Sequence, residues 1–368
     1  AATMVTAGIF MVARMSPLFE LSDTALSFVM IIGSITALFM GFLGVIQNDI
    51  KRVVAYSTLS QLGYMTVALG ASAYSVAIFH LMTHAFFKAL LFLGAGSVIL
   101  SMHHNQDIRW MGGLRKYMPW TWITFLVGTL ALIGTPFFAG FYSKYTIIEA
   151  AKEHAVEQGG FIAQYGYYAV LMGAFVTSFY SFRLLYMTFF GKERFREVAH
   201  DDHAHGDHDH GHAHEPHESP WVVTLPLILL AIPSVVIGYL TIGPMLHGKT
   251  TGGEEAGKPF FDGAIQMPAH GVMAKLGEEF HGALQMALHG FTQWPFVLTL
   301  AGFLLATWMY LLNPGVAAKA RKMFALPVRI LEDKYGFDKL WINGFAGGSI
   351  LLGRIARWFD SRVIDEYL

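Results

Sequence analysis

Long runs of apolar residues recur along the chain and constrain its fold more than any other feature. The hydrocarbon core of a bilayer is about 30 Å thick and takes a helix of roughly 20 apolar residues. Every backbone amide in lipid needs an internal partner, so we expect helices. The runs lie near residues 25–46, 53–71, 73–101, 120–143, 161–190, 220–246 and 295–312, after a partial run at 1–13. The sequence therefore predicts an all-α, polytopic membrane helix bundle.

The composition agrees with a membrane protein and excludes several other classes. Only 14% of the residues are charged, against about 25% in soluble domains. The 25 Lys and Arg are balanced by 26 Asp and Glu, which leaves no basic surface for nucleic acid, so no nucleic-acid partner is expected. Without cysteine the chain cannot form a disulfide or ligate an iron–sulfur cluster through thiolates.

Charges in the loops predict how the helices are oriented. Lysine and arginine gather in the loops at 47–52, 102–119 and 191–219 and after residue 313, whereas the loop at 16–24 has none. Loops rich in Lys and Arg stay on the cytoplasmic side of a membrane. We therefore expect the first group of segments to be cytoplasmic.

A cluster of basic residues lies in the run at 73–101. His80, His84 and Lys88 follow at intervals of four, so a helix places them on one face. Lys88 lies about 20 Å from either end of the run, near mid-membrane. A lysine there costs on the order of 2.5–3.5 kcal/mol and marks a functional site by default. The three residues are predicted to transfer protons; the alternative is a lysine that reaches the surface beside two histidines bonded in the core.

The run at 120–143 contains a proline flanked by glycines. Pro136 removes a backbone donor and clashes with the preceding turn, so with Gly134 and Gly140 it predicts a broken helix. Broken helices at membrane depth usually line a hydrated cavity. Lys144, about two turns later, is a second candidate for proton transfer. The alternative is an ordinary kink with Lys144 at the outer interface.

The run at 53–71 is more polar than its neighbours. At helical spacing it carries a stripe of hydrogen-bonding side chains, namely Ser57, Ser60, Gln61 and Tyr64. Such a stripe predicts either a path for water or bonds to neighbouring helices. Arg183 lies about two turns from the end of its own run, and we expect its guanidinium to reach toward the surface.

The loop at 191–219 is dense in histidine. Imidazoles at this density bind zinc, nickel or copper loosely. Between 199 and 218 no apolar side chain larger than alanine is present to build a fixed site, apart from proline. We expect no dedicated metal centre, only weak incidental affinity at residues such as His203, His205, His208 and His210.

One motif match is interpreted as coincidence. Residues 243–250, GPMLHGKT, fit the phosphate-binding pattern GxxxxGK[ST]. A true phosphate-binding loop joins a strand to a helix that points its N-terminus at the phosphates. Here an apolar membrane run precedes the match and TGGEEAGKP follows it, so neither partner element is expected.

Three classes of function suit a membrane bundle: proton conduction, transport of a divalent metal, and a structural scaffold. A metal transporter needs carboxylate or thiolate ligands at mid-depth. The expected spans hold no Asp or Glu, and Lys88 would repel a cation. A scaffold leaves a buried lysine unexplained. Proton conduction is therefore favoured.

Several stretches resemble a known family. NDIKRVVAYSTLSQLGYMTVALG, HLMTHAFFKALLFLGAGSVI and GTPFFAGFYSK resemble the antiporter-like subunits of respiratory complex I and of Mrp-type cation/proton antiporters. The tail LEDKYGFDKLWINGFAGG resembles the lateral-helix region of complex I subunit L, which is mitochondrial subunit 5. The His-rich loop followed by ESPWVV is similar to bacterial subunit L.

The resemblance implies two inverted five-helix repeats, each with one broken helix. In the family's second half-channel, lysines at the positions of Lys88 and Lys144 and histidines at His80 and His84 pass protons through water and polar groups. NADH, FMN, iron–sulfur clusters and quinone are expected in other subunits, and no cofactor in this chain. The expected partners are the lipid bilayer and the other membrane subunits, especially a neighbouring antiporter-like subunit along the lateral helix. Where the family often has an acidic residue after the second lysine, this chain has Tyr145.

On this basis we expect a fragment of a proton-translocating subunit of bacterial NADH:quinone oxidoreductase in the cell membrane. The alternative is a subunit of an Mrp-type antiporter. The expected segments are 1–15, the tail of a first-repeat helix; 16–190, the second five-helix repeat; 191–219, the His-rich cytoplasmic loop; 220–313, two further membrane helices with a long outer loop; and 314–368, a cytoplasmic linker and the start of a lateral amphipathic helix. From Ile342 onward this helix could lie on the membrane or a partner, or pack on its own protein.

Overall fold

The computed structural model describes residues 4–196, 215–266 and 271–367. Within these ranges the chain forms helices and short links, and no β-strand. The all-α class expected from the apolar runs is confirmed. The chain divides into two compact units, Ala1–Val316 and Ala317–Leu368.

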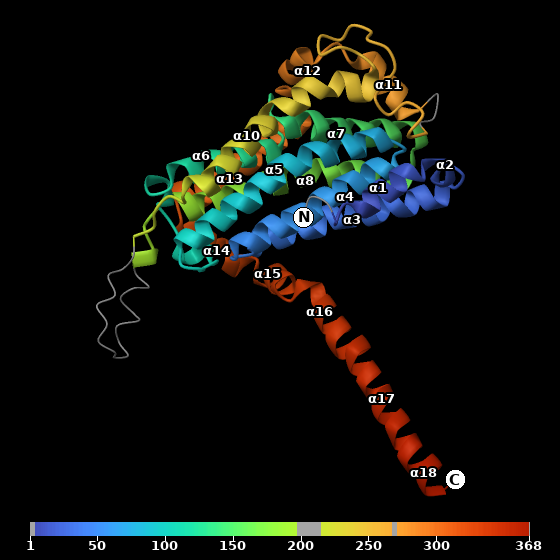
Figure 1. The fold of residues 1–368 in the computed structure, drawn as a ribbon, viewed down its shortest axis with the longest axis vertical. Helices are drawn as coiled ribbons and strands as arrows, with labels where there is room; N and C mark the ends of the chain where they lie inside the picture. Colours follow the sequence, from blue (N-terminus) through green and yellow to red (C-terminus); the bar gives the residue numbers. More distant parts are fainter. Residues whose placement is uncertain (1–3, 197–214, 267–270, 368) are drawn as a thin grey trace. The chain divides into compact units, whose positions relative to one another are not determined.

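The first unit is a bundle of long helices that run alongside one another (Figure 1). Its helices are α1 (Ala7–Arg14), α2 (Ser16–Phe19), α3 (Asp23–Ile46), α4 (Ile50–Gly70), α5 (Tyr74–Ser101), α6 (Pro119–Ile133), α7 (Ala139–Gln158), α8 (Gly160–Phe189), α10 (Trp221–Ile242), α11 (Val272–Glu279), α12 (Ala283–Gly290) and α13 (Trp294–Thr307). α3 packs on α4 and α8, α5 packs on α4, α6 and α10, and α13 packs on α8.

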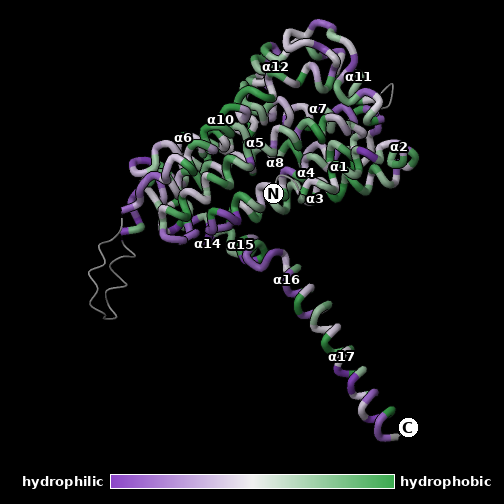
Figure 2. Tube along the Cα trace, viewed as in Figure 1, coloured by the Kyte–Doolittle hydropathy of each residue, from purple (hydrophilic) through white to green (hydrophobic). Residues whose placement is uncertain are grey.

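Five helices of the described residues are long and apolar enough to cross a membrane. They are α3, α5, α8 and the continuous segments Trp221–His247 and Trp294–Leu312. Figure 2 shows hydrophobic residues along most of the bundle's helices. α4 is less apolar than these helices. It contacts α3, α5, α7 and α8, so protein rather than lipid surrounds most of its polar side chains.

Caps and a close helix contact set the position of α4. Ser22 begins α3 by accepting a hydrogen bond from the backbone N of Ala25 at 3.3 Å, and Asp49 caps α4 in the same way at 3.0 Å. α3 and α4 approach closely at Gly63, where a Cβ would lie 2.4 Å from the backbone N of Ala37. The tight pair holds the polar stripe of α4 against α5.

Two expected loops contain helices. The segment between the apolar runs at 120–143 and 161–190, expected to be a loop, is almost entirely helical, because α7 continues to Gln158 and α8 begins at Gly160. The residues involved, rich in Ala, Glu and Lys, are strong helix formers even though they are not apolar. The outer loop expected at 247–294 contains α11 and α12, which pack on α7.

The second unit is helical over most of its described length, with turns at Phe324 and Asp333. It holds the end of α14 (Gly315–Met323), then α15 (Ala325–Glu332), α16 (Phe337–Lys339), α17 (Gly347–Phe359) and α18 (Asp365–Tyr367). Hydrophobic and hydrophilic residues alternate along α17 (Figure 2). The expected amphipathic helix is therefore present, and the surface on which it lies stays a prediction.

Candidate functional site

The broken helix lies between α6 and α7. Gly134 caps α6 in the left-handed conformation, with φ of 81°, and its N–H donates to the carbonyl O of Ala131 at 3.2 Å. Pro136 lies in the link that follows, and α7 begins at Ala139. The break that Pro136 predicts is present in the fold.

α7 starts in direct contact with the end of α6. A Cβ on Gly140 would lie 1.9 Å from the carbonyl O of Ala131, so glycine is required at this approach. The ring of Phe87 on α5 is the next neighbour of that position, at 3.3 Å. This contact brings the first turns of α7, with Ser143 and Lys144, against the histidine-bearing face of α5.

Ser143 connects α7 with the first histidine of α5. Its Oγ lies 2.8 Å from Nδ1 of His80 and 2.7 Å from Oγ1 of Thr83. On the other side of the ring, Nε2 of His80 lies 3.2 Å from Oε1 of Gln61 on α4. His80 therefore has a hydrogen-bond partner at each ring nitrogen, which lets an imidazole take up a proton on one side and release one on the other.

Lys144 is buried beside this network. Its Nζ has no hydrogen-bond partner and lies 4.9 Å from the ring centre of Tyr64 on α4. Attraction between an ammonium and a ring face contributes roughly 0.5–2 kcal/mol. Tyr64 is itself held by α8, since its hydroxyl donates to the carbonyl O of Val170 at 2.7 Å. At 2% exposure, Lys144 lies inside the bundle rather than at an outer interface.

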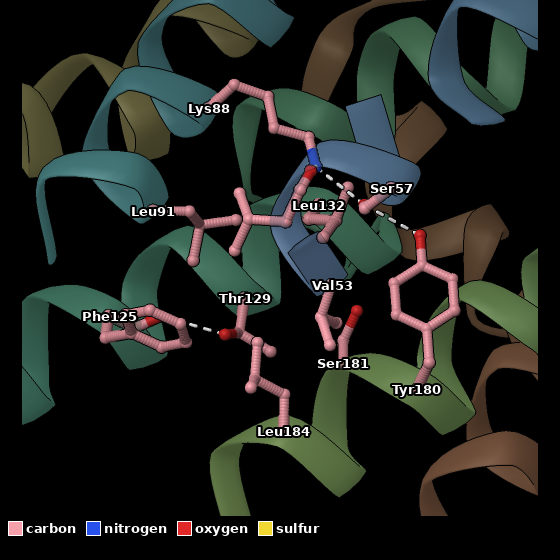
Figure 3. Close-up of a pocket in the computed structure, with 11 residues that line it drawn as sticks. Val53, Ser57, Lys88, Leu91, Phe125, Thr129, Leu132, Tyr180, Ser181 and Leu184 are labelled. Carbon is pink, nitrogen blue, oxygen red and sulfur yellow. Dashed lines mark hydrogen bonds between the residues drawn. The ribbon is translucent and has the colours of Figure 1, made fainter. Parts of the chain in front are cut away.

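Lys88 lies further along the same face of α5. Its Nζ donates to Oγ of Ser57 at 2.6 Å and to the carbonyl O of Val54 at 3.4 Å. Tyr180 on α8 donates to the same Ser57 oxygen at 2.7 Å (Figure 3). Lys88 is fully buried, so it does not reach the surface.

His84 lies one turn from both His80 and Lys88 on α5. Its ring centre is 6.0 Å from that of His80 and 5.3 Å from that of Phe87. Both ring nitrogens are buried without a hydrogen-bond partner. An unsatisfied buried polar atom costs about 1–3 kcal/mol, and water commonly satisfies such atoms in proteins. Among His80, His84 and Lys88, His84 is thus the residue whose ring nitrogens need water as a hydrogen-bond partner.

A small cavity adjoins Lys88. Its volume is about 10 Å³, roughly the room that one water molecule needs. Side chains of four helices line it, among them Ser57 of α4, Lys88 of α5, Phe125 of α6, and Ser181 and Leu184 of α8 (Figure 3). The cavity therefore leaves a small space beside Lys88, bordered by apolar atoms.

The polar stripe of α4 divides between two faces. Ser57 contacts Lys88, Gln61 contacts His80, and the ring of Tyr64 faces Lys144. Ser60 turns away, and its Oγ donates to the carbonyl O of Ala37 on α3 at 2.7 Å. Ser60 therefore joins helices and does not belong to the cluster.

The structure adds Thr83, Ser143 and Tyr180 to the expected residues. Thr83 lies between the two histidines, and Ser143 directly precedes Lys144, so their positions beside expected residues could have indicated them. Tyr180 belongs to a polar row in an otherwise apolar helix, with Thr177 and Ser181. Its partner, however, depends on how α8 packs against α4.

Among the described residues, buried charge is entirely basic. Lys88, Lys144 and Arg183 are buried, and no Asp or Glu of the described ranges is. Arg183 donates to the carbonyl O of Gln47 at 2.6 Å and to Oδ1 of Asn48 at 2.8 Å. The expectation that Arg183 reaches the surface is wrong, because it binds the link between α3 and α4.

Several charged loops meet where α4 and α6 begin and α5 and α8 end, which we call the α6 end. There the carboxylate of Glu193 accepts hydrogen bonds from Arg196 at 2.8 Å and Lys116 at 3.3 Å. The bond from Arg196 holds the pKa of Glu193 below its usual range. Glu218 accepts from the backbone N of Trp120 at 2.7 Å and so caps α6.

The histidines expected to bind metal weakly, His203, His205, His208 and His210, lie outside the described residues. Within the described ranges, no group of three or more His, Cys, Asp or Glu is placed to hold a metal ion. The structure therefore offers no metal centre in the part of the chain that it describes.

The match to a phosphate-binding loop is confirmed as coincidence. Gly243–His247 forms a π-helical turn, η4, that continues α10, so no strand leads into the motif. Lys249 donates to the carbonyl O of Gly277 at 2.7 Å, which ties this segment to the end of α11.

Comparisons with known proteins agree on one family. Residues 1–173 match the family model described as NADH:quinone oxidoreductase/Mrp antiporter, TM. NADH-quinone oxidoreductase subunit L of Neisseria meningitidis is 58% identical over 372 residues, which cover 100% of this chain and 53% of that protein. Subunit L of Rhodobacter capsulatus is 41% identical, covering 99% and 56%. NADH-ubiquinone oxidoreductase chain 5 of Triticum aestivum is 49% identical, covering 67% and 34%.

The chain spans about half the length of the subunit L proteins that it matches. The region matched by the family model contains α5 and α7, and hence Lys88 and Lys144. Residues 1–173 are therefore similar to the NADH:quinone oxidoreductase/Mrp antiporter transmembrane family, and over its whole length the chain is similar to about half of subunit L.

Proposed function

We propose that this chain is part of a proton-translocating membrane subunit of a bacterial NADH:quinone oxidoreductase. The observation that supports this most is the placement of two buried lysines, one on α5 and one on the broken α7, with His80 and His84 between them. Buried ionisable residues in a membrane bundle mark pathways for protons. The described residues bury no carboxylate that would neutralise the lysines permanently.

Lys88 has partners that serve both of its protonation states. As an ammonium it donates to Ser57 and Val54. As an amine, its lone pair can accept from the Ser57 hydroxyl, whose oxygen still accepts from Tyr180. A serine hydroxyl has one donor and two acceptor positions, so the change requires only rotation of the hydroxyl. Lys88 can therefore exchange a proton without rebuilding its surroundings.

His80 and His84 relay protons between the lysines in this proposal. His80 is bonded on both ring nitrogens, and His84 needs water to connect it with Lys88. Lys144, beside the break, exchanges protons with the outer aqueous side. Tyr64 of α4 positions it through the face of its ring.

The remaining parts of the proposal concern the whole complex. This chain carries no redox group; NADH, FMN, iron–sulfur clusters and quinone bind other subunits. The α6 end and the second unit lie on the cytoplasmic side of the cell membrane, and the second unit extends toward a neighbouring antiporter-like subunit. An Mrp-type antiporter is the second candidate, because the family model covers both. The extent of the subunit L matches, which include the chain beyond residue 173, favours the oxidoreductase.

Lys144→Met tests the proposal in the full-length subunit, assembled in membrane vesicles. Because methionine cannot carry a proton, we expect NADH-driven pumping, followed with a pH-sensitive dye, to fall by about tenfold or more. Lys152→Met is the matched control, since Lys152 lies on the same helix, is half-exposed and pairs with Glu149 at 2.9 Å. Equal pumping by the two assembled variants would remove Lys144 from the pathway.

Tyr180→Phe tests the positioning of Lys88. It removes one hydrogen bond from Ser57 and keeps the ring, so pumping should fall by about fivefold and its pH profile should change. Tyr186→Phe is the control, because that hydroxyl lies on the same helix and pairs with Oγ1 of Thr307 at 2.9 Å. A merely structural role for Tyr180 predicts lower stability with an unaltered pH profile.

A further inference from the structure

The first turn of α7 is held by two helices that lie beyond the residues matched by the family model. α10 and α12 both pack on α7, and both follow residue 173. On α10, a Cβ on Gly238 would lie 2.6 Å from the carbonyl O of Ala139 and 2.7 Å from its Cα. Backbone therefore meets backbone at this point, and only glycine, which has no Cβ, allows the approach.

α12 contacts the same turn through an aromatic ring. A Cβ on Gly290 would overlap Cζ and Cε2 of Phe141, so this ring fills the space that a side chain would take. The ring also stacks on Tyr145, with ring centres 5.3 Å apart. At the end of α12, the ring centre of Phe291 lies 6.2 Å from that of Phe137 in the break. α12 thus contacts the link before α7 and, through one ring, the second turn of α7.

The break itself is held on both sides. Phe137 has a φ of 74°, a left-handed conformation that a bulky residue keeps only where the surrounding structure imposes it. On the α6 side, Oγ1 of Thr299 on α13 donates to the carbonyl O of Ile133, the last residue of α6, at 3.5 Å. Ser178 of α8 donates in turn to the carbonyl O of Thr299 at 2.7 Å. A hinge needs residues that can change φ and ψ, so these contacts favour a fixed link over a hinge.

Lys144 depends on this turn for its position. Its Nζ has no hydrogen-bond partner among the described residues and lies 4.9 Å from the ring centre of Tyr64. Because no hydrogen bond fixes the amine, its place follows from where α7 begins. Ala139 and Phe141 precede Lys144 by no more than about one and a half helical turns. A shift of the first turn therefore moves the lysine with it.

We propose that α10 and α12 position Lys144 for proton transfer, by holding the first turn of α7 through Gly238 and Gly290. This inference rests on the proposed function and adds to it two positioning residues outside the region that the family model matches. A displacement of about 1 Å at a reacting group can lower a rate by about 100-fold. The two glycines therefore affect pumping although neither touches the amine of Lys144.

Gly290→Ala tests the contact of α12 in the assembled complex. The added methyl group displaces Phe141 and with it Tyr145, so we expect NADH-driven pumping to fall by about tenfold and its pH profile to shift. Phe141→Leu removes the opposing ring atoms and, combined with Gly290→Ala, should restore most of the pumping and the original profile.

Gly70→Ala is the matched control for a tight contact elsewhere. Its Cβ would lie 2.6 Å from Cβ of Met30, between α4 and α3. We expect this variant to lower the amount of assembled subunit without shifting the pH profile of pumping. If Gly290→Ala also left the profile unshifted, its effect would be general damage to the fold, and the inference would be overturned.

Cysteine labelling tests the positioning without reference to pumping. The chain has no cysteine of its own, so Lys144→Cys places a single thiol in it. In vesicles of the assembled complex, we expect a small water-soluble methanethiosulfonate to label this thiol several-fold faster when Gly238→Ala or Gly290→Ala is added, because a displaced first turn opens the buried position to water. Gly70→Ala should leave the rate unchanged.

The two measurements separate this inference from the proposed function. Equal labelling rates with and without the alanines on α10 and α12 would show that these helices do not hold Lys144, and would overturn the inference. Normal pumping by Lys144→Met would instead overturn the role of Lys144 in the proposed function, whatever the labelling rates.

Discussion

Lys88→Met is expected to lower NADH-driven proton pumping by about 100-fold or more, while the subunit still assembles. Methionine fills much of the lysine's volume but cannot carry a proton. It also leaves no new unsatisfied hydroxyl, because Ser57 still accepts from Tyr180 at 2.7 Å. Dye quenching in vesicles measures pumping, and native gels measure assembly.

Lys51→Met is the control for the loss of a positive charge. Lys51 is exposed in the first turn of α4 and should leave pumping unchanged. If the assembled Lys88→Met complex pumped like Lys51→Met, Lys88 would not be a proton carrier. The proposed function would then lose its central residue.

Gly140→Ala is expected to have the largest effect on folding. The added Cβ would lie 1.9 Å from the carbonyl O of Ala131, which also accepts the capping hydrogen bond from Gly134. Backbone atoms on both sides must move, so the free energy of unfolding should fall by about 3 kcal/mol. The amount of assembled subunit and its thermal stability in detergent measure this loss.

Gly96→Ala provides the matched control on α5. A Cβ there meets no atom within 4 Å. The substitution should be neutral or raise helix stability by up to roughly 1 kcal/mol. Similar losses for the two alanines would mean that the close contact of α6 and α7 does not limit stability.

Features that depend on one helix could be predicted from sequence. The spacing of His80, His84 and Lys88 determines their common face wherever the helix packs. Pro136 breaks its helix through its own ring and missing N–H, and no distant contact is needed. The end of α7 could not be judged from apolarity, since the helix continues through charged residues to Gln158.

Features that depend on contacts between helices were beyond the sequence. Ser57 and Ser60 lie in one stripe, yet Ser57 binds Lys88 and Ser60 binds α3. The two serines are separated by a small angle around α4, and this angle turns one toward α5 and the other toward α3. Which serine faces which helix depends on how α3 and α5 pack against α4. The pairing of His80 with Ser143 likewise depends on the contact of α7 with α6.

The basic interior has a consequence for ion selectivity. A sodium or calcium ion entering this bundle would need oxygen ligands, above all carboxylates, to replace its hydration shell. It would instead meet the amines of Lys88 and Lys144, and no buried carboxylate among the described residues. A proton needs no such shell, because it moves by exchanging covalent bonds along water, hydroxyls and imidazoles. In the proposed function, the buried lysines therefore disfavour entry of metal cations by their charge while leaving protons a route.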